Sequence, residues 1–222
     1  MNHIERIVST LETNRNAIQA EKMSAYMRNK FPFYGVTKPN LDKLFGEWWK
    51  QSGKMLTRLE KWDLIEVLWQ EEFRESHYWA IQIMLKMKNN DFEPSDIDKF
   101  KFVIVNHSWW DSVDLIASNT LTQYSLQFPE ETKMWVEEWT ISNNIWLQRS
   151  TLIFQLKLKS NTDLELLSKQ ISTLKKDKEF FIQKAIGWSL REVSKTNKEW
   201  VRQEIERQNL YGLSKREASK YL

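Results

Sequence analysis

Four helix-like segments recur along this chain at an almost constant spacing of about 35 residues. They are HYWAIQIMLK (77–86), DSVDLIASNT (111–120), LQRSTLIFQL (147–156) and IQKAIGWSLR (182–191). Superposition of the four makes Ala80, Asp114, Arg149 and Lys184 equivalent, at spacings of 34, 35 and 35 residues. A more charged segment precedes each copy, and a shorter polar copy, residues 214–222, ends the chain. Two helices per unit at this period predict an α-solenoid of HEAT or tetratricopeptide-like repeats, curved, with one helix of each pair lining its concave face.

Other features of the sequence also favour helices. Apolar residues recur at helical spacing, as in Leu64, Val67 and Leu68. Only 5 glycines and 4 prolines occur in 222 residues, which argues against β-sandwiches, barrels and glycine-rich phosphate loops. No stretch has the composition of an interdomain linker. We therefore predict an all-α protein with a single domain of HEAT-like repeats over residues 1–222.

The composition excludes several kinds of chemistry. The chain has no cysteine, and its three histidines, His3, His77 and His107, are not paired at the spacing of metal ligands. It contains no HExxH, Walker A or GxSxG motif. No apolar run approaches the roughly 18 residues of a membrane span, and the N-terminus does not have the apolar core of a signal peptide. We expect a cytoplasmic monomer with no metal, no cofactor and no membrane partner.

The charge of the chain is unevenly distributed. Residues 145–222 hold 16 Lys and Arg against 9 Asp and Glu, whereas the whole chain has a net charge of only +3. A basic region of this size suits a polyanionic partner such as nucleic acid, although a solvated helix surface has the same composition.

The repeat places charged residues at one recurring position. Residues four apart share a face of a helix, so Trp110 lies beside Asp114 and Trp188 beside Lys184. With Arg149, these side chains are predicted to converge on one groove, unless they are simply exposed positions of the solenoid. A carboxylate between aromatic rings can stabilise a developing oxocarbenium ion and orient a water molecule, as cleavage of an N-glycosidic bond requires. Indole faces also attract cations, and an N3- or N7-alkylated purine is a cation.

Several of these segments resemble a known family. The strings are AYMRNKFPFYGVTKPNLDKL (25–44), HSWWDSVDLIA (107–117), NIWLQRSTLIFQLK (144–157) and EFFIQKAIGWSLREVSKTN (179–197). They are similar to the DNA alkylation repair glycosylases of the AlkD family, which are built from HEAT-like repeats. The WWDxVD string and the tryptophan of IGW are the most specific parts of a resemblance that spans almost the whole chain.

The resemblance implies roles for individual residues. The catalytic carboxylate falls on Asp114, the flanking tryptophans on Trp110 and Trp188, a phosphate-holding arginine on Arg149 and a DNA-contacting tyrosine on Tyr26. Three further cations are compatible with phosphate contacts, namely Lys157, Lys184 and Arg191. Two neighbours of the site are interpreted as structural, Trp109 as a packing residue and Asp111 as a charge near a helix N-terminus.

The function implied is hydrolytic excision of N3- or N7-alkylated purines from duplex DNA, a step of base excision repair. The alternatives are a catalytically silent relative that binds duplex or branched DNA, and an α-solenoid scaffold for a peptide partner.

Overall fold

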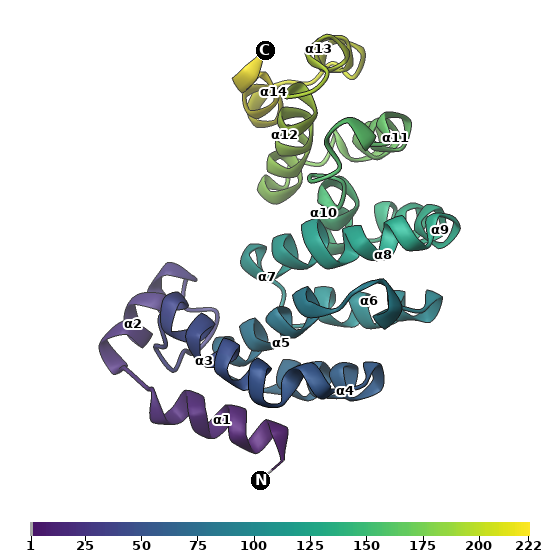
Figure 1. The fold of residues 1–222 in the computed structure, drawn as a ribbon. Coiled ribbons are helices and arrows are strands. Elements are labelled where there is room, and N and C mark those ends of the chain that lie inside the picture. The colour runs from purple at the N-terminus through teal and green to yellow at the C-terminus, as the bar shows by residue number, and fades with distance from the viewer. Residues whose placement is uncertain (1) are drawn as a thin grey trace. The chain divides into compact units, whose positions relative to one another are not determined.

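The computed structural model of the protein describes residues 2–222, and its regular elements over that range are all helices (Figure 1). The all-helical α-solenoid class predicted from the repeat is therefore confirmed. Residue contacts divide the chain after Phe92 into two compact units. The single domain over residues 1–222 stays a prediction.

The first unit contains five α-helices and two short 3₁₀ turns. They are α1 (His3–Thr13), α2 (Ala17–Tyr26), α3 (Lys38–Gln51), η1 (Gly53–Met55), α4 (Arg58–Gln70), α5 (Arg74–Lys86) and η2 (Asn89–Asp91). Aromatic rings fill much of its core, where the Trp79 ring lies 5.7 Å from Phe45 and 5.9 Å from Trp48, centroid to centroid. Many of the tryptophans therefore serve packing, as expected for large apolar rings.

A buried carboxylate fixes the loop between α2 and α3. Glu75, on α5, is fully buried, and its carboxylate accepts hydrogen bonds from the backbone N–H groups of Tyr34, Gly35 and Val36 at 2.8–3.0 Å. Gly35 has φ +88° and lies so close to Asn16 that an added Cβ would be 2.0 Å from the Asn16 carbonyl oxygen. Only glycine suits this position. The loop therefore holds the N-terminus of α2 in place.

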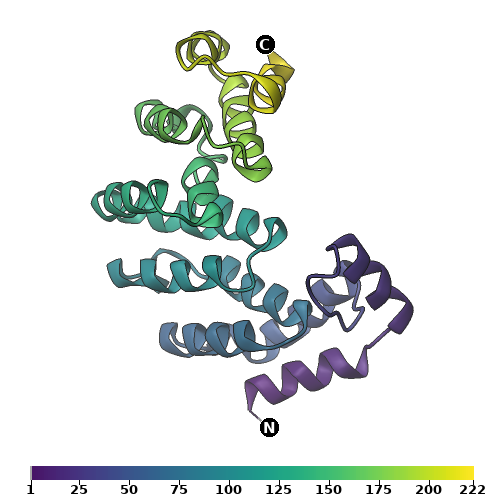
Figure 2. The ribbon, with the colours of Figure 1, turned by 180° about the vertical axis from the view of Figure 1, so that it is seen from behind.

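The second unit consists of stacked helix pairs. Its elements are η3 (Pro94–Asp96), α6 (Ile97–Val105), α7 (Trp110–Leu115), a π-helical segment (Ile116–Leu121), α8 (Thr122–Gln127), α9 (Pro129–Thr140), α10 (Ile145–Ile153), η5 (Lys159–Asn161), α11 (Leu164–Leu174), α12 (Phe180–Ser194), α13 (Lys198–Arg207), α14 (Gly212–Ala218) and η6 (Ser219–Tyr221). In both views α9, α11 and α13 follow one another in one row, and α7, α10 and α12 form the other (Figures 1 and 2). This is the two-row arrangement of a solenoid.

Each predicted repeat segment overlaps a helix, α5 in the first unit and α7, α10 and α12 in the second, but two boundaries differ from the prediction. α10 ends at Ile153, before the predicted residue 156. The Thr122 hydroxyl of α8 donates a hydrogen bond to the Phe154 carbonyl, which would accept a backbone N–H if the helix continued for another turn. The segment 111–120 also enters a π-helix at Ile116, where the Thr122 hydroxyl oxygen lies 3.1 Å from the Ala117 carbonyl oxygen. Periodicity cannot reveal such a segment, which is common near functional sites.

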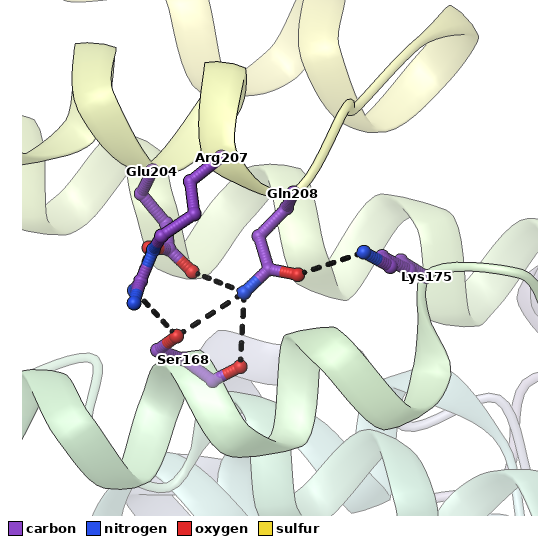
Figure 3. A network of polar contacts seen from close by, with 5 residues as sticks. All are labelled: Ser168, Lys175, Glu204, Arg207 and Gln208. Atoms are coloured by element: carbon purple, nitrogen blue, oxygen red, sulfur yellow. Dashed lines mark hydrogen bonds and ion pairs between the residues drawn. The ribbon is translucent and has the colours of Figure 1, made fainter.

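A polar network joins α13 to α11 (Figure 3). Gln208 donates to the Ser168 hydroxyl at 3.2 Å and to the buried Glu204 carboxylate at 2.8 Å, and it accepts from the Lys175 ammonium at 3.0 Å. Arg207 donates to the Ser168 hydroxyl at 2.7 Å and pairs with Glu204. Every member of the network has a partner, so a buried carboxylate is accommodated between two repeats.

No helix within residues 2–222 combines the length and the apolar character that crossing a bilayer requires.

Candidate active site

A pocket of about 350 Å³ opens in the second unit where α7, α10 and α12 meet. It is lined by Trp110, Asp114, Arg149, Phe180, Phe181, Lys184, Trp188 and Arg191. The five residues predicted to converge on one groove, two indoles, one carboxylate and two cations, all lie in this wall. The structure therefore brings together the side chains that the 35-residue repeat predicted to share one groove.

Helix geometry presents the two tryptophans. Trp110 begins α7 and Asp114 follows one turn later, so both side chains point from the same face of that helix. Trp188 stands in the same relation to Lys184 on α12. Both indoles are partly exposed, unlike the buried tryptophans of the core. Part of each indole therefore lines the pocket.

Asp114 and Arg149 form a bidentate ion pair across the pocket. Nε of Arg149 donates to Oδ1 of Asp114 at 2.7 Å, and Nη2 donates to Oδ2 at 2.8 Å. Nη1 donates to the backbone carbonyl of Phe181 at 2.6 Å, and Arg149 is only 3% exposed. The planar fork of an arginine fits a carboxylate in this way and fixes its orientation.

The surroundings of Asp114 set its protonation. Burial raises the pKa of the Asp114 carboxyl above its usual value, while the hydrogen bonds and the charge of Arg149 oppose that rise and the nearby Asp111 carboxylate adds to it. Because the two donors of Arg149 bind the ionised form, we expect Asp114 to be a carboxylate at neutral pH.

An aromatic cluster supports the floor of the pocket. Trp109 is 7% exposed, and its ring lies 5.7 Å from Trp146 and 5.3 Å from Phe181. Its interpretation as a packing residue is confirmed. Asp111 lies in the first turn of α7, as expected for an acidic residue near a helix N-terminus.

Comparison with known proteins decides the family. The family model described as "DNA alkylation repair enzyme" matches residues 7–222. The chain belongs to this DNA alkylation repair family. Among solved structures, a "Predicted DNA alkylation repair enzyme from Enterococcus faecalis" superposes with a TM-score of 0.86 at 35% identity, covering 94% of this chain and 97% of that one. A comparison with curated proteins finds no match.

Three residues around the pocket of this DNA alkylation repair protein were missed by the sequence analysis. Phe180 and Phe181 form one wall, and Phe180 is 56% exposed although it is a large apolar residue. Glu217, on α14, lies behind Lys184 and Arg191 and pairs with both. The paired phenylalanines of EFFIQKAIGW were visible in the sequence, but nothing there connects Glu217 to residues 26 and 33 positions earlier.

The predicted DNA contacts fall in three places. Arg149, Lys184 and Arg191 line the pocket. Lys157 is exposed, donates a hydrogen bond to the side chain of Asn119 and borders a different pocket. Tyr26 ends α2 in the first unit and is 70% exposed.

Within residues 2–222, no cluster of three or more histidine and acidic side chains is arranged to hold a metal ion.

Proposed function

We propose that this protein is a DNA glycosylase that excises cationic N3- and N7-alkylated purines by hydrolysis of the N-glycosidic bond. The observation that carries the proposal is the Asp114 carboxylate, held by Arg149 in a pocket with aromatic walls. As the bond from C1′ to the purine nitrogen breaks, its electron pair neutralises the purine and leaves an oxocarbenium ion. A fixed negative charge at that point stabilises the transition state.

The carboxylate also orients the nucleophile. A water molecule hydrogen-bonded to Asp114 attacks C1′ and releases its proton to the solvent, which completes hydrolysis to an abasic site. Trp110 and Trp188 favour the cationic nucleoside and the sugar cation through their ring faces, by roughly 0.5–2 kcal/mol each. Arg149 keeps the carboxylate oriented toward the pocket.

Phosphate contacts would bind the duplex. Lys184 and Arg191 at the pocket and Lys157 beyond it are the predicted cations, with Tyr26 as a contact from the first unit. A phosphate contact of Arg149 stays a prediction, since three of its N–H groups already bind Asp114 and Phe181. The salt dependence of DNA binding by Arg149→Ala tests this contact. The loss of one phosphate contact lowers the slope of log K against log salt by about one unit.

The pocket favours lesions that are already charged. Among the residues that line it, Asp114 is the one carboxylate, and no histidine is present. A neutral lesion such as uracil or hypoxanthine must be protonated as it leaves, which requires a general acid. A cationic purine leaves as a neutral base without one.

The test is base release from oligonucleotides that each carry one lesion, detected as alkali-labile abasic sites. We expect release of 3-methyladenine and 7-methylguanine and no release of uracil or hypoxanthine. Excision of uracil at the rate of 7-methylguanine would contradict the mechanism. Retained DNA binding with no release of any base would identify a catalytically silent relative instead.

The role of Asp114 has its own test. Asp114→Asn removes the negative charge at nearly constant size, so we expect the single-turnover rate to fall by on the order of 10²–10³ while DNA affinity is kept. Asp98→Asn, on the exposed side of α6, is the control and should excise at the wild-type rate. Near-normal excision by Asp114→Asn would remove Asp114 from the mechanism.

A further inference from the structure

We propose that Glu217 is a positioning residue that holds Lys184 and Arg191 at the pocket so that both address DNA phosphates. This inference rests on the proposed DNA-binding role of the pocket. Glu217 is 3% exposed and lies on α14, in the last repeat. Its Oε1 lies 3.1 Å from Nζ of Lys184, and its Oε2 lies 2.7 Å from Nη1 of Arg191.

Two of the cations that pair with Glu217 line the pocket. Lys184 and Arg191 are seven residues apart on α12, on the face that also carries Trp188. A third cation, Lys220, lies 2.8 Å from Oε2 of Glu217 but does not line the pocket. One carboxylate thus gathers three cations, and the cluster keeps a net positive charge.

Close packing brings Glu217 to this place. Gly187, on α12, faces α14, and an added Cβ there would be 2.4 Å from Cβ of Glu217 and 2.8 Å from the Ser214 carbonyl oxygen. A larger residue would force α14 away from α12. The glycine of the IGW string therefore allows the last repeat to reach the cations of the site.

The ion pairs are expected to persist when phosphates bind. The Lys220 ammonium, with help from Lys184, lowers the pKa of Glu217 to about 2, so the carboxylate stays charged at neutral pH. A buried carboxylate that lost its cations would remain unpaired at a high cost in free energy. Lys184 and Arg191 each keep N–H groups that do not face Glu217, because an ammonium has three and a guanidinium five. These remaining donors can bind phosphate from a fixed position.

The experiment measures how binding of an undamaged duplex depends on salt. Each phosphate contact contributes about 0.9 unit to the slope of log K against log salt. We expect Glu217→Gln to reduce the slope by about one to two units, because Lys184 and Arg191 are no longer held. In a protein that already carries Lys184→Ala and Arg191→Ala, Glu217→Gln should have no further effect on the slope. A residue that only stabilises the fold would give the same change in both backgrounds.

Glu204→Gln is the matched control. Glu204 is also a buried glutamate paired with an arginine three residues later, but it lies in the network between α11 and α13 and not at the pocket (Figure 3). Its replacement should leave the slope unchanged even if the melting temperature falls. If Glu217→Gln does not fold, Glu217→Asp replaces it, because this variant keeps the negative charge on a side chain one methylene shorter. It should reduce the slope of log K against log salt by a smaller amount.

The outcomes separate this inference from the proposed function. An unchanged slope in the Glu217 variants would overturn positioning by Glu217. A steeper slope would also overturn it, because it would mean that Glu217 competes with phosphate for the cations. Failure of the wild-type protein to release 7-methylguanine would refute the glycosylase and leave the binding result standing.

Discussion

At the scale of single residues, the pair of Asp114 and Arg149 makes the pH dependence of catalysis testable. If Asp114 is the catalytic carboxylate of the proposed glycosylase, excision requires its ionised form, so the rate should fall as the pH drops through the pKa of this carboxyl. Burial raises that pKa and Arg149 opposes the rise. Arg149→Gln removes the opposition, so the pKa should rise further and the acid limb of the pH–rate profile should move to higher pH. Single-turnover rates across the acidic range measure the shift.

Lys184→Gln is the comparison for this measurement. Lys184 shares the pocket, but it is not among the groups that shift the pKa of Asp114. Lys184→Gln should weaken DNA binding and leave the pH midpoint of the acid limb of the pH–rate profile unchanged. An acid limb of Arg149→Gln that coincides with that of the wild type would show that Arg149 does not control the protonation of Asp114.

At the scale of elements, Glu75 holds the loop between α2 and α3. Glu75→Gln replaces one carboxylate oxygen by an NH₂ group that cannot accept from the backbone N–H groups of Tyr34, Gly35 and Val36. Leaving a buried donor unsatisfied costs about 1–3 kcal/mol, so the free energy of unfolding in urea should fall by that amount. Glu72→Gln, at a nearby exposed position, should change it by less than about 0.5 kcal/mol. Equal stability of the two variants would show that the loop does not depend on the carboxylate.

At the scale of the whole molecule, the basic C-terminal third predicts a salt-sensitive complex with DNA. If Arg149, Lys157, Lys184 and Arg191 each neutralise one phosphate, the slope of log K against log salt should be roughly −3.6, and a fourfold rise in salt should weaken binding about 150-fold. Fluorescence anisotropy with a labelled undamaged duplex measures this slope. A slope near zero would indicate that the positive charge is a solvated surface, and it would favour a scaffold for a peptide partner.

The sequence alone determined the repeat and most of the candidate site. Both follow from local rules, since the 35-residue period and the helical spacing fix which residues share a face. Trp110 with Asp114 and Lys184 with Trp188 could be paired in this way, and Arg149 could be aligned with them. Local chemistry also sets where helices begin, since Asn144 and Asn197 cap the helices that follow them through side-chain hydrogen bonds.

Only the tertiary structure decided how these groups are bonded. The bidentate contact of Arg149 with Asp114 depends on the distance between α7 and α10, which the register does not give. The place of Glu217 behind Lys184 and Arg191 depends on the absence of a side chain at Gly187. Contacts between repeats come from packing at a scale of ångströms, whereas a sequence period gives only the order of the helices and the faces they share.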